Sequence, residues 1–238
     1  MMDSFSIPEG VVAFDSRADL DGQLSREIAG RLRLALERRA LASLVVSGGR
    51  TPVGLFEALS QEPLDWSRVI VTLADERWVD NDASESNERL VRTHLLQNRA
   101  QDARLVALKT PALNADAGEV ECRQRLLGLP ETLDVVVLGM GEDGHTASLF
   151  PSAEGLGRAL DLSSGVDCLA LSPSTAPKPR MTLTLPRLLR SEQVYLHLCG
   201  ESKLPVLAQA LKPGPVELMP VRALLRQSQV PLAIYWAP

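Results

Sequence analysis

The sequence predicts a single α/β domain, in which a mostly parallel sheet has helices on both faces. Short, continuous apolar runs rich in Val, Leu and Ile alternate along the chain with longer segments that have helical periodicity. Several of these runs end directly in turns rich in glycine or charged residues. The 238 residues show no low-complexity linker and no fixed-period repeat, so we expect one domain over residues 1–238.

The first half of the chain begins with a strand and a long amphipathic helix. Residues 11–14 are mostly apolar, and Ser16 is a typical N-cap residue for the helix that follows. Apolar residues then recur at fourfold spacing on one helix face, at Leu20, Leu24, Ile28, Leu32 and Leu36. Further strands are expected at residues 43–46, 69–73 and 105–108, and further helices from Pro52, at 87–96 and at 119–127.

The second half repeats this alternation. The run at 133–138 is short, continuous and β-branched, as in a buried parallel strand. Short strands at 169–171 and 181–185 enclose the loop 172–180 and fit a small antiparallel portion near residues 168–185. The remaining elements are expected to be a strand at 194–199, helices at 203–211 and 221–225, and a last strand at 232–236.

The composition excludes several classes of protein. The net charge of -5 gives no support for nucleic-acid binding, and no apolar run is long enough to span a membrane. The three cysteines have no CxxC spacing, and the N-terminus lacks a basic region followed by an apolar one, so we expect reduced thiols and a cytoplasmic location. The motifs of metal sites are missing, so we expect no metal, and the GxSxG motif of serine hydrolases is missing as well. Any hydrolysis is expected to use an activated water.

The most informative segment follows the strand at 133–138. The turn GMGEDGHTASLFP at 139–151 holds Asp143 and His145 between glycines, on a chain with only three histidines. Open α/β sheets place their chemistry in such turns at the carboxyl ends of strands. The competing interpretation is a plain glycine-rich turn with a solvated acid and histidine. His94 and His197 have no acid motif beside them and are expected to be structural.

A second loop, SGGRTP at 47–52, joins the strand at 43–46 to a helix. We expect Thr51 to cap this helix, with Pro52 at its first position. Glycine backbone and a helix N-terminus favour an anion, so the loop predicts phosphate or sugar contact, although it can also be a simple tight turn. The residues expected to bind there are Ser47, Gly48, Gly49, Arg50 and Thr51.

Two further loops carry cations. DERWV at 75–79 follows a strand, and the planar guanidinium of Arg77 suits a phosphate or carboxylate, although Arg77 and its neighbouring acids can also simply pair. The proline-stiffened loop 172–180 carries Lys178 and Arg180 and suits a preformed anion site, or a solvated loop before a strand.

Together these motifs resemble a known family. SGGRTP at 47–52, DERWV at 75–79, SNERL at 86–90, GMGEDGHTASLFP at 139–151 and KPRMTLTLP at 178–186 are similar in order and spacing to the 6-phosphogluconolactonase family. The resemblance spans most of the chain and implies a Rossmann-like fold of the glucosamine-6-phosphate isomerase/deaminase superfamily. It implies hydrolysis of 6-phospho-D-glucono-1,5-lactone to 6-phosphogluconate in the oxidative pentose phosphate pathway, without metal or cofactor.

This resemblance leads to a mechanistic hypothesis. His145 acts as the base for the attacking water, Asp143 orients His145 or stabilises its cation, and Arg77 or glycine N–H groups stabilise the oxyanion. Asp75 holds substrate hydroxyls. The phosphate contacts loop 47–51 and the cations, with the division among Arg50, Arg77, Lys178 and Arg180 left open. We expect the chain to bind a small sugar-phosphate lactone, to bind neither nucleic acid nor membrane, and to be a monomer or a weak homo-oligomer.

Two alternatives stay open. A deaminase-like enzyme shares the SGG and DGH segments, but its turn supplies a further acid where this chain has Ser148-Leu149-Phe150-Pro151, and no acid follows until Glu154. A non-enzymatic sugar-phosphate sensor needs the phosphate loop but not His145.

The chain departs from the family pattern at Lys178-Pro179-Arg180. Members of the family often carry extra residues between the Lys-Pro pair and the Arg of this loop, whereas here Arg180 follows Pro179 directly.

Overall fold

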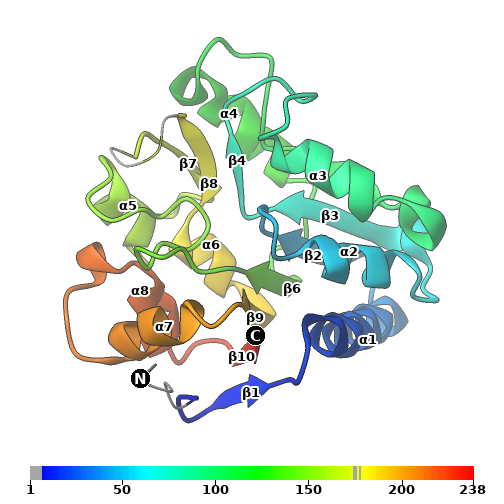
Figure 1. Ribbon diagram of the computed structural model, residues 1–238. Helices are drawn as coiled ribbons and strands as arrows, with labels where there is room; N and C mark the ends of the chain where they lie inside the picture. Colours follow the sequence, from blue (N-terminus) through cyan, green and yellow to red (C-terminus); the bar gives the residue numbers. More distant parts are fainter. Residues whose placement is uncertain (1–6, 174–175, 177) are drawn as a thin grey trace.

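The computed structural model describes residues 7–173, 176 and 178–238 and confirms the α/β architecture with a mostly parallel sheet (Figure 1). Among the described residues, seven strands form one sheet in which every pair is parallel. The strand order is β1 (Val11–Ala13), β10 (Leu232–Ala237), β9 (Ser191–Cys199), β6 (Leu133–Leu138), β2 (Ala42–Val46), β3 (Val69–Leu73) and β5 (Arg104–Val106).

A second, three-stranded antiparallel sheet confirms the antiparallel portion near residues 168–185. Its order is β4 (Asp75–Arg77), β8 (Arg180–Leu183) and β7 (Cys168–Leu171), and β4 is a strand that the sequence pattern did not predict. Ala74 joins the two sheets, because its N–H donates to Val46 of β2 at 2.8 Å and its carbonyl accepts from Leu183 at 2.8 Å. The small sheet therefore lies at the carboxyl ends of the parallel strands.

Helices flank the large sheet. The strand order, together with the rule that crossovers between parallel strands are right-handed, predicts that the helices after β1 and β2 cover one face of the sheet and that the helices linking β6, β9 and β10 cover the other. The helices of the described residues are α1 (Arg17–Arg38), α2 (Val53–Ser60), α3 (Asn87–His94), α4 (Ala115–Leu126), α5 (Leu156–Leu160), α6 (Leu185–Leu189), α7 (Lys203–Leu211) and α8 (Val221–Arg226). α1 packs on α2 and on the central strands, α6 packs on β9, and α4 packs on the small sheet.

The predicted helix ends are partly correct. Ser16 caps α1, and its hydroxyl accepts from the Asp19 N–H at 3.2 Å. The expected cap at Thr51 is wrong: α2 begins at Val53, and Pro52 occupies the N-cap without a side-chain hydrogen bond. Pro52 already has helical backbone angles, and its carbonyl accepts the first helical bond from Phe56 at 2.8 Å, so the cap shifts by one residue. The predicted strand at 181–185 also ends early, because Thr184 caps α6.

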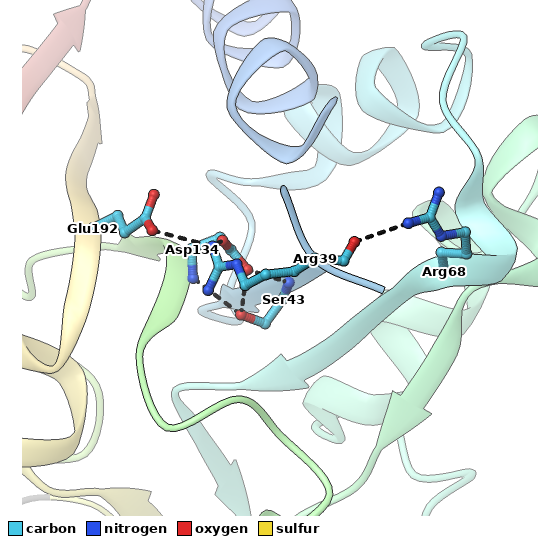
Figure 2. A network of polar contacts seen from close by, with 5 residues as sticks. All are labelled: Arg39, Ser43, Arg68, Asp134 and Glu192. Carbon is cyan, nitrogen blue, oxygen red and sulfur yellow. Dashed lines mark hydrogen bonds and ion pairs between the residues drawn. The ribbon is translucent and has the colours of Figure 1, made fainter. Parts of the chain in front are cut away.

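A polar network fastens the amino ends of the central strands (Figure 2). The buried Asp134 carboxylate of β6 accepts from the Ser43 N–H at 2.7 Å and from its hydroxyl at 2.9 Å. Arg39 pairs with both Asp134 and Glu192, and its carbonyl accepts from Arg68 at 2.8 Å. Burial raises the pKa of Asp134, against the hydrogen bonds from Ser43 and the charge of Arg39. The network ties β2, β6 and β9 together at the edge opposite the glycine-rich turns.

In the part of the chain that the structure describes, no helix combines the length and apolarity needed to cross a membrane.

Candidate active site

The site lies where the direction of the strand order reverses. From β2 the chain proceeds through β3 to β5, and from β6 it proceeds through β9 to β10 in the opposite direction, although β2 and β6 are neighbours. The loops that leave β2 and β6 therefore separate toward opposite faces and leave a crevice between them. These are the loops at 47–52 and 139–151, which the sequence analysis selected.

A cavity of about 370 Å³ occupies this crevice. We call it the central cavity. Its size suits a small-molecule ligand. Of the predicted site residues, the following line it: Ser47, Gly48, Gly49, Thr51, Asp75, Arg77, His145 and Arg180. Side chains that the prediction did not assign to the site also line it, among them Asn87, Phe150, His197, Cys199 and Lys203.

The turn after β6 is shaped by its glycines. Gly144 has a φ of +77°, a conformation that favours glycine. A Cβ at Gly141 would lie 2.1 Å from the His145 ring, so only glycine allows the ring to fold back over the turn. The His145 carbonyl accepts from the Gly141 N–H at 2.9 Å, which closes the turn. The backbone thus fixes the direction of the imidazole.

Asp143 and His145 are in direct contact. Nδ1 of His145 lies 2.5 Å from Oδ1 of Asp143, and the same oxygen accepts from the His145 N–H at 3.1 Å. Burial raises the pKa of Asp143, but the hydrogen bonds from His145 and its charge outweigh this and hold the pKa below its ordinary value. Asp143 therefore stays ionised and fixes a proton on Nδ1, so Nε2 is the nitrogen left for a ligand in the cavity.

Phe150 forms part of the same arrangement. Its ring stacks on His145 with the centroids 4.0 Å apart, and the guanidinium of Arg180 lies 5.5 Å from its centroid. The aromatic face therefore supports the imidazole and the cation together.

Arg77 and Arg180 face the cavity as direct cross-strand partners of β4 and β8. Like charges directly opposite one another destabilise a sheet, so this pairing favours a bound anion. Burial lowers the pKa of Arg180, as does the charge of Arg77, whereas Asp75 opposes both. Arg77 Nη1 donates to the Glu85 carbonyl at 2.5 Å, and its buried Nε has no partner among the described residues.

Asp75 sits in a buried polar cluster at the start of β4. Its Oδ2 accepts from the Ser148 hydroxyl at 2.5 Å. Its carbonyl accepts from Asn87 Nδ2 at 2.9 Å. The next residue, Glu76, accepts from the N–H groups of Arg77 at 2.7 Å and Asn87 at 2.8 Å. Asp75 and Arg77 are thus held rigidly against the first turn of α3.

The loop at 47–52 is only partly directed into the cavity. Ser47, Gly48, Gly49 and Thr51 line it, and the buried Ser47 hydroxyl has no partner among the described residues. Arg50 is exposed and does not line the cavity. The Lys178 side chain is also exposed and outside the lining, and residues 174–175 and 177 of its loop lie outside the described residues.

Lys203 is a cation that the sequence analysis missed. It begins α7 after the short turn at 200–202 that follows β9, and its Nζ lies 2.5 Å from Oε1 of Glu142 in the turn after β6. The signal was present in the sequence, because Gly200-Glu201-Ser202-Lys203 follows a strand of the same sheet edge. Among the described residues, the cavity lining contains three cationic side chains, Arg77, Arg180 and Lys203, and one acidic side chain, Asp75. The cavity wall is therefore basic, although the whole chain has a net charge of -5.

The two other histidines differ in position. His94 pairs with Glu57 at 3.0 Å and is not in the cavity lining. His197 is buried and lines the cavity, and its Nε2 lies 3.1 Å from Asp21 Oδ1. Across residues 7–173, 176 and 178–238, no three His, Cys, Asp or Glu side chains are placed to hold a metal ion.

The family model for "Glucosamine-6-phosphate isomerases/6-phosphogluconolactonase" matches residues 15–236. The chain belongs to this family. The resemblance predicted from the motifs is thereby confirmed. A family member named 6-phosphogluconolactonase from Pseudomonas aeruginosa is 46% identical over 229 residues, which cover 96% of this chain and 95% of the relative. One of the same name from Rhizobium meliloti is 44% identical and covers 94% and 97%.

Solved structures of the family confirm the fold. The crystal structure of a 6-phosphogluconolactonase from Shewanella baltica has a TM-score of 0.94 at 47% identity and covers 98% of this chain and 100% of its own. A monomeric glucosamine-6-phosphate deaminase has a TM-score of 0.75 at 20% identity and covers 94% and 96%. At that identity the likeness shows the fold alone. The fold is therefore common to both branches of the family, and the site must discriminate between them.

Proposed function

We propose that this chain hydrolyses 6-phospho-D-glucono-1,5-lactone to 6-phospho-D-gluconate, in the oxidative pentose phosphate pathway. The observation that carries the proposal is the Asp143–His145 pair, 2.5 Å apart, at the edge of a cavity whose wall holds three cations. A hydrogen bond from Nδ1 to the Asp143 carboxylate leaves Nε2 as the ring nitrogen that faces a ligand and can accept a proton from water. The names of relatives at 44–46% identity support the same lactone chemistry.

The reaction proceeds in two steps. His145 Nε2 takes a proton from water as the water oxygen bonds to the lactone carbonyl carbon, C1. The carbonyl oxygen becomes an oxyanion, which Arg77 or the backbone N–H groups of the glycine turns stabilise. The oxyanion then re-forms the carbonyl, the bond from C1 to the ring oxygen breaks, and the ring oxygen takes the proton from the imidazolium. The acid product finally releases a proton to solvent.

The substrate phosphate lies against the basic wall. Arg180 and Lys203 bind it together with loop 47–51, and Arg77 either joins them or serves the oxyanion. The unpartnered Ser47 hydroxyl and Arg77 Nε support this assignment, because a buried polar group without a partner costs about 1–3 kcal/mol. Asp75 binds substrate hydroxyls. Arg50 and Lys178 are exposed, and we assign them to the rim of the site.

The decisive experiment compares lactone hydrolysis by the wild type with the spontaneous rate. His145→Ala is expected to lower kcat by about 10²–10⁴-fold, and Asp143→Asn to lower kcat with little change in KM. His94→Ala is the matched control, because His94 also pairs with a carboxylate but lies outside the cavity lining. A His145→Ala enzyme with full kcat would refute the proposed base. Arg180→Ala should raise KM for the phosphorylated lactone more than for the unphosphorylated one.

The deaminase alternative has less support in this site. Glu154, the first acid after the DGH segment, is exposed and does not line the cavity. Ammonia release from glucosamine 6-phosphate tests this alternative directly. A chain that binds 6-phosphogluconate without hydrolysing the lactone would instead be a sensor.

We also propose a cytoplasmic location, because the three cysteines are buried free thiols, as expected in a reducing compartment.

A further inference from the structure

Asn87 is an almost fully buried amide in the wall of the central cavity. It is the first residue of α3 and is 1% exposed. The SNERL motif drew attention to this segment, but neither the motif nor the lactone mechanism assigns Asn87 a role. A polar side chain that lines a ligand cavity at such burial is expected to have a hydrogen-bonding task.

The orientation of the amide is fixed by its partners. Nδ2 donates to the Asp75 carbonyl at 2.9 Å and lies 3.5 Å from Asp75 Oδ1. Both partners are acceptors, so the atom that faces them must be the NH₂ nitrogen, and Oδ1 points the other way. None of the described residues donates to this Oδ1. The carbonyl oxygen is therefore the end of Asn87 that remains for a ligand.

The surrounding backbone makes room for the amide and holds it. A Cβ at Gly48 would lie 1.8 Å from Asn87 Oδ1, so the amide occupies space that any other residue at 48 would fill. The Asn87 N–H donates to Glu76 at 2.8 Å, and the Ser86 hydroxyl caps α3 by accepting from Arg89. The amide is thus preorganised before a ligand binds, which lowers the entropy cost of binding.

Chemistry restricts the group that Oδ1 can bind. An amide oxygen only accepts hydrogen bonds, and neither an ionised phosphate nor a lactone carbonyl has a proton to donate. A hydroxyl of the sugar does. The neighbouring Asp75 carboxylate is a second acceptor on the same wall. We propose that Asn87 is a specificity-determining residue whose Oδ1 accepts a hydrogen bond from a ring hydroxyl of the lactone substrate, beside Asp75. This inference rests on the proposed function.

Substrate analogues test the inference. Three lactones that lack the hydroxyl at C2, C3 or C4 are prepared by oxidising the corresponding deoxy-glucose 6-phosphates. For the wild type, removal of the hydroxyl that Asn87 binds should lower kcat/KM by about 10-fold. Asn87→Ala should lower kcat/KM for the full substrate by a similar factor and cause no further loss with that one analogue. For each of the other two analogues, the loss in kcat/KM relative to the full substrate should be the same in the wild type and in Asn87→Ala.

Two further variants separate binding from structure. Asn87→Asp replaces the NH₂ group with an oxygen that faces the Asp75 carbonyl and carboxylate, so it should turn the side chain away and lose the discrimination between the full and deoxy substrates, as Asn87→Ala does. Ser86→Ala removes the cap of α3 without touching the amide, and should lower the melting temperature while leaving the analogue pattern intact. If Asn87→Ala loses kcat/KM equally with all three analogues, the inference is wrong. It is also wrong if kcat falls by the same factor for every substrate at constant KM, because that result indicates that Asn87 positions the attacking water. A wild type that hydrolyses no lactone would refute the proposed function instead.

Discussion

The imidazole of His145 stacks on the ring of Phe150, with the ring centroids 4.0 Å apart and the planes inclined by 24°. Asp143 fixes the same imidazole through Nδ1. The ring is therefore held at its edge by a carboxylate and on its face by an aromatic side chain, so Nε2 has one direction open to it. General-base catalysis depends on such alignment.

Replacing Phe150 with Leu should weaken catalysis without unfolding the protein. Leucine preserves apolar burial but removes the face that supports His145 and Arg180, an interaction of about 0.5–1.5 kcal/mol. We expect a fall in kcat of about 2- to 10-fold and a smaller rise in KM. Steady-state kinetics measure both, and Phe150→Tyr is the control that keeps the ring. Equal kinetics for the Leu variant and the wild type would show that the Phe150 ring does not contribute to the alignment of His145, the proposed base.

Gly48 is expected to tolerate no side chain. A Cβ there would meet Asn87 at 1.8 Å, so Gly48→Ala must displace either the amide or loop 47–51. A shift of about 1 Å in a positioning group can cost about 10²-fold in rate, and we expect a loss of that order in kcat/KM. Gly30→Ala is the matched control: a Cβ at this position in α1 meets nothing within 4 Å, so this variant should keep full activity and gain about 1 kcal/mol of stability.

Much of the site could be predicted because sequence order decides which turns meet. Parallel strands bring their carboxyl ends to one edge, so the turns after β2, β3 and β6 had to converge there. Ser47, Asp75 and His145 are accordingly in one cavity. The glycines and the Asp–His pair are local features, and local features are what a sequence pattern records.

The missed features depend on contacts between distant segments. Arg77 and Arg180 are opposite one another only because residues 75–77 form a strand, and three residues are too few for a periodic signal. Lys203 enters the site through the position of α7, and Phe150 through the fold of the turn over His145. The pattern likewise could not show that Arg50 and Lys178 point outward, because exposure in a loop is decided by tertiary packing.

The Asp134 network should control stability without affecting catalysis. Asp134→Ala leaves the buried Ser43 N–H without its acceptor, which costs about 1–3 kcal/mol in the free energy of unfolding. The network joins the amino ends of β2 and β6 (Figure 2). The cavity lies at their carboxyl ends, so kcat/KM should stay unchanged. Urea denaturation and kinetics on the same samples test both statements. Glu192→Ala, at the exposed end of the network, is the control and should cost less than about 1 kcal/mol.

Glu76 should make stability depend on pH in an unusual direction for an acid. Burial raises its pKa above the ordinary value of 4.5, although the N–H groups of Asn87, Glu88 and Arg77 oppose this. The folded protein therefore holds a proton at Glu76 more tightly than the unfolded chain does. By linkage, this contribution to stability is complete below pH 4.5 and is lost as the pH rises through the folded pKa.

A comparison with Glu76→Gln isolates that contribution. Glutamine does not titrate. Its NH₂ group would face a backbone N–H group whose hydrogen bond the Glu76 carboxylate accepts, and two donors cannot pair, so the variant should be less stable at every pH. The difference in the free energy of unfolding between wild type and variant should be largest near pH 4 and should narrow toward neutral pH. Urea denaturation of both proteins at intervals between pH 4 and pH 8 gives this difference directly. A gap that widens with pH would mean that the three backbone donors outweigh burial and that the folded pKa lies below the unfolded one.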